Sequence, residues 1–346
     1  MKRGVRREIG STVSGLETFY LSEEERQRLT EMRPLRRMLH RLVWLVKSLL
    51  MKLTPARRVL LAFALAFVLV GAGRVEVGAV RIVYSFRTLG DVLLFVLLML
   101  ELKDKLLARD ELEAGRTVQI ALMPERSPLV SGWDLWLYTE PANDVGGDLI
   151  DHLQIDDRRH GVALGDVAGK ALPAALLMVK LQATLRALVP QFDSFSELGT
   201  AINRILVRDG LSNRFATLVY LILTCDSGAV RVLNAGHMPP LVIRGRAIEE
   251  MARGSMALGL MPDSPFVEQR VELSKGNVII VYSDGITEAM NVAGEFFGDE
   301  RLRAGIQETA GQPVAAIGAR ILQALEIFVG DAPPHDDVSL VVLRRQ

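Results

Sequence analysis

The chain has 346 residues, and its 41 Lys plus Arg balance its 41 Asp plus Glu, so the formal net charge at pH 7 is zero. This balance excludes the strongly basic composition typical of nucleic-acid-binding proteins, and no nucleic-acid partner is expected. A single cysteine, Cys225, excludes an internal disulfide and a thiolate metal site, and it favours a reducing compartment.

The first segment, residues 1–54, is predicted to be a polar tail followed by a basic amphipathic helix. From Leu35 to Leu53, apolar residues recur at helical spacing with arginines and lysines between them. Residues 33–58 contain eight Lys or Arg and no Asp or Glu, which is typical of a segment at a membrane surface. An ordinary packing helix of a small bundle is the alternative.

The second segment, residues 55–102, is predicted to be an all-α membrane hairpin with two passes. Residues 59–73 carry no charge, and residues 89–102 carry Asp91 and Glu101 near their ends. Each apolar core is shorter than the roughly 20 residues that a bilayer-crossing helix needs, so flanking residues would complete each pass. Basic residues on the outer flanks place both ends, and the rest of the chain, on the cytoplasmic side of the cell membrane. A soluble or in-plane helical bundle is the alternative.

The third segment, residues 103–123, is predicted to be a linker helix. It is rich in charged, helix-favouring residues, and Pro124 stops it. Its heptad pattern is poor, and Gly115 interrupts it. A homodimer through a coiled coil and a plain connecting helix therefore fit the segment equally well.

The last segment, residues 124–346, is predicted to be an α+β domain. Two helices are expected at residues 171–189 and 313–328. Short apolar runs broken by Gly, Asp and Pro predict strands at residues 134–139, 149–155, 161–164, 216–224, 230–233, 241–243, 267–273, 278–282 and 339–343. Many strands with few helices between them favour antiparallel sheets over a doubly wound parallel sheet.

Aspartates recur beside glycines where these predicted strands end. They are Asp148, Asp166, Asp284 and the adjacent pair Asp336 and Asp337. Each one alone is ordinary turn chemistry. Together, clustered carboxylates without His or Cys partners favour a hard divalent ion such as Mg²⁺ or Mn²⁺.

The sequence around these aspartates resembles the SpoIIE branch of the metal-dependent protein phosphatase (PPM) family. The matching strings, spread over residues 121–344, are GGD, GDVAGKALPAALLM, NAGHMPPL, VYSDGITEAMN and DDVSLVVL. The resemblance implies a sandwich of two antiparallel β-sheets flanked by helices, with two Mn²⁺ or Mg²⁺ ions at one edge. It also implies hydrolysis of phosphoserine or phosphothreonine on a protein.

The same resemblance implies the site residues. It makes Asp148, Asp166, Asp284 and Asp336 catalytic metal ligands, with the backbone carbonyl of Val167 as a further ligand. Asp337 stands where other branches of the family often carry Asn, so it ranks after Asp336 as a ligand. The sequence departs from the family pattern at Ala171, where glycine is common, at the start of a helix that helps to switch activity in this family.

The implied partner is a phosphorylated STAS-domain protein, the anti-sigma factor antagonist of bacterial partner-switching pathways. A catalytically silent membrane-bound module that binds such a protein is the alternative. Two histidines near the site have competing interpretations. His237 either acts as a general acid or, as we favour, braces its loop, and His335 either protonates the leaving serine oxygen or is a solvated loop residue.

Overall fold

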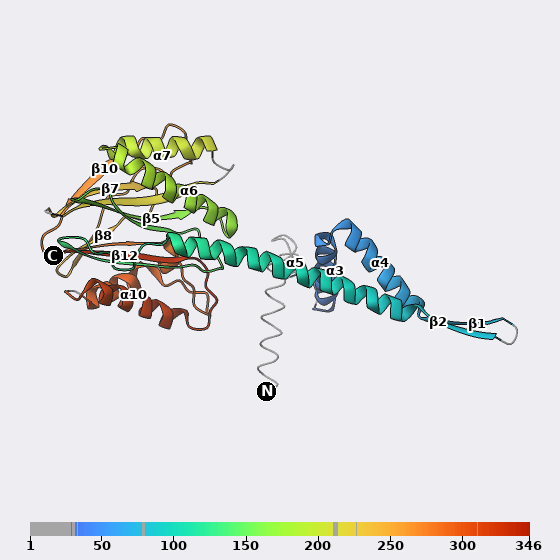
Figure 1. Cartoon of the computed structure of the whole chain (residues 1–346). Coiled ribbons are helices and arrows are strands. Elements are labelled where there is room, and N and C mark those ends of the chain that lie inside the picture. Colours follow the sequence, from blue (N-terminus) through green and yellow to red (C-terminus); the bar gives the residue numbers. More distant parts are fainter. Residues whose placement is uncertain are drawn as a thin grey trace. The chain divides into compact units, whose positions relative to one another are not determined.

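The computed structural model describes residues 29, 32, 34–77, 80–209, 214–225, 227–309 and 311–346 (Figure 1). The chain divides into two compact units, unit 1 (Met1–Ala108) and unit 2 (Arg109–Gln346). The polar tail predicted before residue 29 lies outside the described residues.

Unit 1 contains helices and one two-stranded ribbon. Its elements are α3 (Pro34–Lys52), α4 (Pro55–Val70), β1 (Ala72–Val77), β2 (Val80–Ser85) and the first part of α5 (Phe86–Leu122). The basic amphipathic helix expected from the sequence corresponds to α3. The two apolar helices pack closely, because a Cβ added to Gly90 on α5 would lie 2.7 Å from the Ala64 carbonyl oxygen on α4. The ion pair of Arg57 with Glu101, 2.7 Å long, also joins them.

The β1–β2 ribbon corrects the expectation of an all-α hairpin. Residues 72–77 and 80–85 pair as antiparallel strands, with Val77 opposite Val80. The physical reason lies in the local sequence AGRVEVGAVRIVYS, in which β-branched residues are frequent and a glycine separates the two runs. The helix α4 therefore ends after 16 residues, a length of about 24 Å that is less than the roughly 30 Å of a bilayer core.

Among the described helices, one stretch is long and apolar enough to cross a membrane by length and composition, Leu172–Gln191. It belongs to unit 2 and corresponds to α6 (Leu172–Leu188) and the short helix η1 (Val189–Gln191). Leu181 and Leu185 of this stretch are fully buried in a core cluster of that unit. Packing in that core explains part of its apolar character, since 44% of the stretch is buried.

Unit 2 is built on two antiparallel sheets in its described part. One has the strand order β10-β7-β6-β5-β4 and the other the order β3-β12-β11-β8-β9. The bounds are β3 (Trp133–Glu140), β4 (Leu149–Gln154), β5 (Arg159–Val167), β6 (Ala216–Thr224), β7 (Ala229–Ala235), β8 (Leu241–Arg244), β9 (Ala247–Glu250), β10 (Glu268–Glu272), β11 (Val278–Tyr282) and β12 (Val338–Arg345). All nine predicted strands are present, and the α+β expectation is confirmed; the short polar strand β9 was not predicted.

Helices cover the outer faces of both sheets, as Figure 1 shows for α6 and α7 (Phe195–Asp209) on one side and α10 (Val314–Val329) on the other. The helix α9 (Gly298–Glu308) packs in the same core cluster as α10. The helices α6 and α10 were expected, whereas α7 and α9 were missed. The missed α7 carries a readable signal, because Phe195, Leu198, Ile202 and Leu206 are buried at helical spacing.

Three apolar layers result from this arrangement, because each central strand sends alternate side chains to opposite faces. On β6, Leu218 and Ile222 enter the layer under α6 and α7, whereas Val219 and Leu221 enter the layer between the sheets. A third layer lies between the second sheet and α10. Strands that are covered on both faces read as continuous apolar runs, as in ATLVYLILT.

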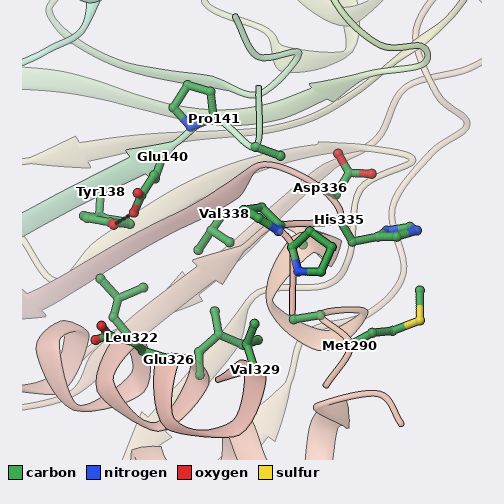
Figure 2. A pocket seen from close by; sticks show the side chains of 16 residues that line it. Tyr138, Glu140, Pro141, Met290, Leu322, Glu326, Val329, His335, Asp336 and Val338 are labelled. Carbon is green, nitrogen blue, oxygen red and sulfur yellow. Dashed lines mark hydrogen bonds between the residues drawn. The ribbon is translucent and has the colours of Figure 1, made fainter. Parts of the chain in front are cut away.

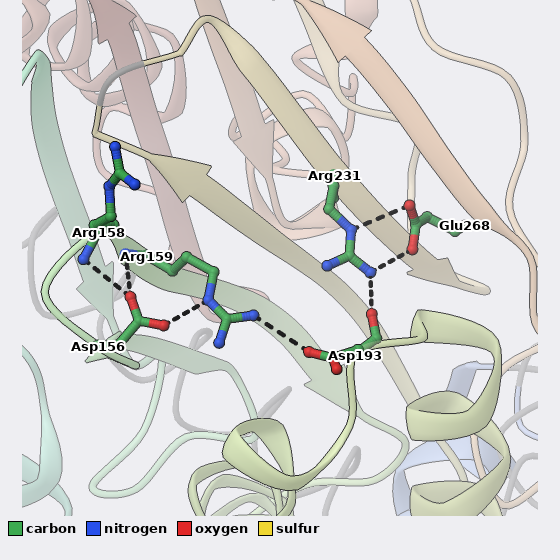
Figure 3. A network of polar contacts seen from close by, with 6 residues as sticks. All are labelled: Asp156, Arg158, Arg159, Asp193, Arg231 and Glu268. Carbon is green, nitrogen blue, oxygen red and sulfur yellow. Dashed lines mark hydrogen bonds and ion pairs between the residues drawn. The ribbon is translucent and has the colours of Figure 1, made fainter.

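A network of hydrogen bonds and ion pairs involves residues of β5, β7 and β10 in the first sheet (Figure 3). Arg231 on β7 forms a two-bond ion pair with Glu268 on β10 and also donates to the backbone carbonyl of Asp193. Arg159 on β5 bonds Asp156 at 2.6 Å and approaches the Asp193 carboxylate at 3.5 Å. These contacts fasten the start of α7 to three strands.

Candidate metal centre

Asp148 and Asp166 face each other at one end of the first sheet. The register of the antiparallel pair β4–β5 places Leu149 opposite Gly165. Asp148 precedes Leu149 and Asp166 follows Gly165, so the two aspartates are the next positions across the same pair. The carboxylates predicted to share a site, 18 residues apart in the sequence, are thus adjacent through sheet pairing.

The other three aspartates lie at one end of the second sheet. Tyr282, the last residue of β11, is paired with Leu340 of β12. Asp284 starts the short helix α8 (Asp284–Thr287) just beyond β11, and Asp336 and Asp337 directly precede β12. The two strands are antiparallel, so the end of one meets the beginning of the other.

Asp337 joins the two sheet ends. Its Oδ2 accepts hydrogen bonds from the backbone N–H groups of Gly147 at 2.6 Å and Asp148 at 3.2 Å, and its Oδ1 accepts one from Ala142 at 2.8 Å. The residue is 7% exposed. Because backbone donors occupy both oxygens, Asp337 acts as a bracket for the Asp148 loop, and this favours Asp336 over Asp337 as a ligand.

The glycines before Asp148 permit this close approach. A Cβ added to Gly146 would lie 2.5 Å from Asp337 Oδ2, a distance that real side chains do not reach. A Cβ added to Gly147 would lie 3.2 Å from the Val167 carbonyl oxygen and 3.5 Å from Asp166 Oδ1. The carbonyl of Val167 and the carboxylate of Asp166 therefore border one common space, which a side chain at residue 147 would fill.

The electrostatics of the cluster are unfavourable without a cation. Asp148 Oδ2 is buried and has no hydrogen-bond donor among the described residues. Burial, together with the charge of Asp166, raises the pKa of Asp148 well above its usual range. Burial and the charges of Asp284 and Asp336 raise the pKa of Asp166 to about 6, and burial followed by Asp336 raises the pKa of Asp284. A bound divalent ion would remove this cost.

The donor chemistry fits Mg²⁺ or Mn²⁺, since it consists of carboxylate and carbonyl oxygens and includes an orphaned buried oxygen. A metal site also requires several of these groups to lie close enough together to bind one ion. Within the described ranges, no group of three or more His, Cys, Asp or Glu side chains is arranged so that it could hold an ion. Lys170 Nζ lies 3.7 Å from Asp336 Oδ2 and supplies a positive charge beside that carboxylate.

His237 braces the two sheets. It is 8% exposed, and burial lowers the pKa of its imidazole to about 4, so the ring is neutral at pH 7. Its Nε2 donates to the Tyr282 carbonyl at 3.1 Å, which leaves Nδ1 to accept from the Thr217 hydroxyl at 2.8 Å. With both nitrogens engaged, a bracing role fits better than a general-acid role. His335, by contrast, is exposed and lies in the loop directly before Asp336.

One residue that holds the site, Gln119, is not predicted by the sequence. Gln119 on α5 is 4% exposed, and its side-chain amide binds both backbone groups of Gly146. Its Nε2 donates to the Gly146 carbonyl at 3.0 Å, and its Oε1 accepts from the Gly146 N–H at 3.1 Å. In a charged helix a lone glutamine looks like a solvated residue, so no local signal reveals this contact.

Comparison with known proteins supports this arrangement at the level of the fold. The SiaA-PP2C domain of Pseudomonas aeruginosa is 18% identical, covers 70% of this chain and 99% of its own, and superposes with a TM-score of 0.61. The PP2C phosphatase domain of SpoIIE from Bacillus subtilis, also 18% identical, covers 63% and 64% of the two chains with a TM-score of 0.54. The PPM-type sandwich expected from the sequence is therefore confirmed.

Among curated proteins, the phosphoserine phosphatase RsbU of Bacillus subtilis is 26% identical over 240 residues, which are 69% of this chain and 71% of RsbU. Protein IcfG of Synechocystis is 25% identical over 273 residues, which are 71% of this chain and 43% of IcfG. The chain thus matches less than half of IcfG. The family model for Stage II sporulation protein E (SpoIIE) matches residues 156–346, more than half of the 346 residues, and the chain therefore belongs to the SpoIIE family.

Proposed function

We propose that unit 2 hydrolyses phosphoserine or phosphothreonine on a protein with the help of two Mn²⁺ or Mg²⁺ ions. The observation that carries the proposal is the buried Asp148 Oδ2, which has no hydrogen-bond donor among the described residues. Asp148 lies opposite Asp166 across the β4–β5 pair, and Asp284 and Asp336 lie at the adjoining ends of β11 and β12. These four carboxylates and the Val167 carbonyl would hold the ions, and since the described side chains form no three-ligand cluster as they stand, they would have to move closer together on binding. When bound, such ions lower the pKa of a water molecule and neutralise phosphoryl oxygens.

The residues of the chain have separate tasks in this proposal. Asp337, Gln119 and the two glycines hold the backbone of the Asp148 loop, so that its carboxylate keeps its position. Neutral His237 keeps β11 aligned with β6. Such prepositioning lowers the reorganisation that the reaction requires.

The proposed substrate is a phosphorylated regulatory protein of the STAS type. Two observations support a protein phosphoester: membership of the SpoIIE family, and similarity to RsbU, which is named a phosphoserine phosphatase. The STAS assignment rests on the resemblance of the sequence motifs to that branch of the family. The test is to identify the phosphoprotein that accumulates when Asp284 is replaced by Asn in the cell.

Unit 1 is proposed to hold the enzyme at the cytoplasmic face of the cell membrane. The apolar side chains of α4 and α5 within unit 1 are unusually exposed, for example Leu69 at 85% and Phe95 and Leu98 at 61% each. Exposed apolar surface on two adjoining helices fits contact with lipid, and the basic residues of α3 suit an anionic surface. Because α4 is only 16 residues long, the proposal is attachment through this exposed apolar surface, and the two complete passes stay a prediction from the sequence.

A homodimer through the linker helix is a second part of the proposal. On α5, Leu102 and Leu106 are four residues apart and are 45% and 51% exposed. Leucines at this spacing form a short apolar stripe that a second copy could cover. Sedimentation of the chain in detergent tests this, because Leu102→Glu with Leu106→Glu should convert a dimer to a monomer.

A Mn²⁺-dependent assay of the full chain on p-nitrophenyl phosphate tests the enzymatic part of the proposal. Wild-type protein should hydrolyse the substrate, EDTA should abolish turnover, and Asp166→Asn or Asp284→Asn should reduce it at least about 100-fold. Circular dichroism would check that each variant is folded. Metal-independent or absent turnover in folded wild-type protein would favour the catalytically silent module instead.

A further inference from the structure

A cavity of about 350 Å³ adjoins the candidate metal centre (Figure 2). It lies between β3, the second half of α10 and the segment that leads into β12. Asp336 lines it, and so does Gly285, the neighbour of Asp284. This volume falls within the range of about 300–1,000 Å³ typical of ligand pockets. A phosphorylated residue at the metal centre would therefore have its sequence neighbours over the cavity.

Most of the cavity wall is apolar. Leu322, Leu325 and Val329 come from α10, and Val338 comes from β12. Figure 2 shows Leu322 and Val329 rising from the helix toward Val338 on the strand. Aliphatic walls of this kind favour an alkyl chain, because its burial releases water from both surfaces.

The polar part of the wall is acidic. Glu140 on β3 and Glu326 on α10 both line the cavity and are exposed. None of the described residues that line it is a lysine or an arginine. The Tyr138 hydroxyl donates to the Glu140 carboxylate, and burial together with that carboxylate raises the pKa of Tyr138, which keeps it a neutral donor.

Asp336 also lines the cavity, but a nearby lysine partly compensates its negative charge. Lys170 Nζ lies 3.7 Å from Asp336 Oδ2 and donates to the His335 carbonyl at 3.2 Å, on the side of the metal centre. Arg126 lies over the Tyr138 ring, 5.1 Å from its centroid, but it does not line the cavity. Glu140 and Glu326 are therefore the acidic groups of the wall that a cation inside the cavity would meet. A ligand that complements both wall types needs an alkyl stem with a cationic end.

We propose that the cavity binds an arginine or lysine side chain of the phosphoprotein substrate, close in sequence to the phosphorylated residue. The stem would pack on the aliphatic wall while the cation meets Glu140 and Glu326. Because Asp336 belongs to the proposed metal centre and also lines the cavity, we place the basic residue within three positions of the phosphoserine, a reach of about 10 Å for an extended chain. This inference rests on the proposed function and names a feature of its substrate.

The test uses the full chain with Mn²⁺ and phosphoserine peptides of one sequence. Each of the three positions on either side of the phosphoserine carries Arg, Met or Glu in turn; Met supplies a similar stem without charge. At one position, Arg should raise kcat/KM about tenfold over Met, and Glu should lower it below Met. The double variant Glu140→Gln with Glu326→Gln should lose the preference for Arg.

Hydrolysis of p-nitrophenyl phosphate is the control, because this substrate has no cationic side chain for Glu140 and Glu326 to bind. Its turnover should stay within about twofold in the double variant, which also shows that the protein is folded. Glu326→Lys should shift the preference toward the Glu peptide.

Three results would overturn the inference. A Met peptide as good as the Arg peptide at every position would show an apolar occupant or none. An Arg preference that survives in the double variant would place the basic residue elsewhere. Turnover of neither peptides nor p-nitrophenyl phosphate by the wild type would instead defeat the proposed function, and this inference with it.

Discussion

At the scale of single residues, Ala171 combines a departure in sequence with strain in structure. It stands where the motif resemblance leads us to expect glycine, and its φ of 61° and ψ of −156° lie in a region that is nearly exclusive to glycine. Among the described non-glycine residues, it alone has a positive φ. It precedes α6 and follows the Asp166 loop, so its strain is stored beside the candidate metal centre.

We expect Ala171→Gly to stabilise unit 2 by about 1 kcal/mol. Relief of a strain of roughly 1–3 kcal/mol is partly offset by the entropy that glycine loses on folding, about 0.5–1 kcal/mol. Urea denaturation measures the difference. The control is Ala183→Gly at an exposed position within α6, which should cost about 1 kcal/mol. Equal losses in the two variants would show that Ala171 is not strained.

The raised pKa of Asp166 predicts a pH-dependent stability in protein treated with EDTA. Its pKa of about 6 exceeds the ordinary value of 3.8, so between these two pH values the folded state binds a proton that the unfolded state has released. The contribution of this group therefore falls as pH rises from about 4 to 6, by on the order of 2–3 kcal/mol.

Denaturation of EDTA-treated wild-type protein and Asp166→Asn at pH 4, 5 and 6 checks this expectation. The variant has no titrating group at this position, so it should gain stability relative to wild type as the pH rises. Parallel pH profiles of the two proteins would contradict the assignment. Adding Mn²⁺ at pH 7 should raise the melting temperature of the wild type more than that of the variant.

At the scale of elements, the end of α5 is fastened to the loop that carries Asp148. Gln119 holds both backbone groups of Gly146, and Gln182 on α6 donates to the Leu122 carbonyl at 2.9 Å, which ties the last turn of the same helix. These contacts lie within unit 2. A helix predicted only as a linker therefore contributes a positioning residue to the site.

We expect Gln119→Leu to destabilise unit 2 by about 2 kcal/mol or more and to lower phosphatase activity. Leucine matches the volume of glutamine but leaves the Gly146 N–H and carbonyl buried without partners, each at a cost of about 1–3 kcal/mol. The control Val118→Ala, at a position that is 57% exposed on the same helix, should change neither property. The affinity for Mn²⁺, measured by calorimetry, should fall in the leucine variant only. An unchanged affinity would restrict Gln119 to a purely structural role.

At the scale of the whole molecule, unit 1 has a composition suited to lipid, yet its ribbon limits how far α4 extends. If the exposed apolar side chains of α4 and α5 contact a bilayer, the chain should sediment with membranes and resist extraction by alkaline carbonate. Replacing Phe63, Leu65 and Leu69, all exposed on α4, by Ser should shift the protein toward the soluble fraction. Release of the wild type by high salt alone would contradict insertion and favour a peripheral or soluble helical bundle.

The residue types, their spacing and the sequence motifs were enough to predict the fold class, the family and most strands of unit 2. Alternation and apolar runs predicted every strand of unit 2 except β9, whose AIEE sequence is too polar for a pattern based on burial. The motifs around the aspartates predicted the fold and the family. They also ranked Asp336 above Asp337, and the three backbone N–H groups bound by Asp337 favour the same order.

Only the tertiary structure decided features that depend on contacts distant in sequence. The contact of Gln119 with Gly146 spans 27 residues, and that of Asp337 with Gly147 spans 190, so no local pattern reveals them. The cavity between β3 and α10, and the β1–β2 ribbon in a segment expected to be helical, are of the same kind. The sequence gives the polarity and shape of each side chain, but the role of that side chain depends on the backbone groups and charges that lie next to it in the folded protein.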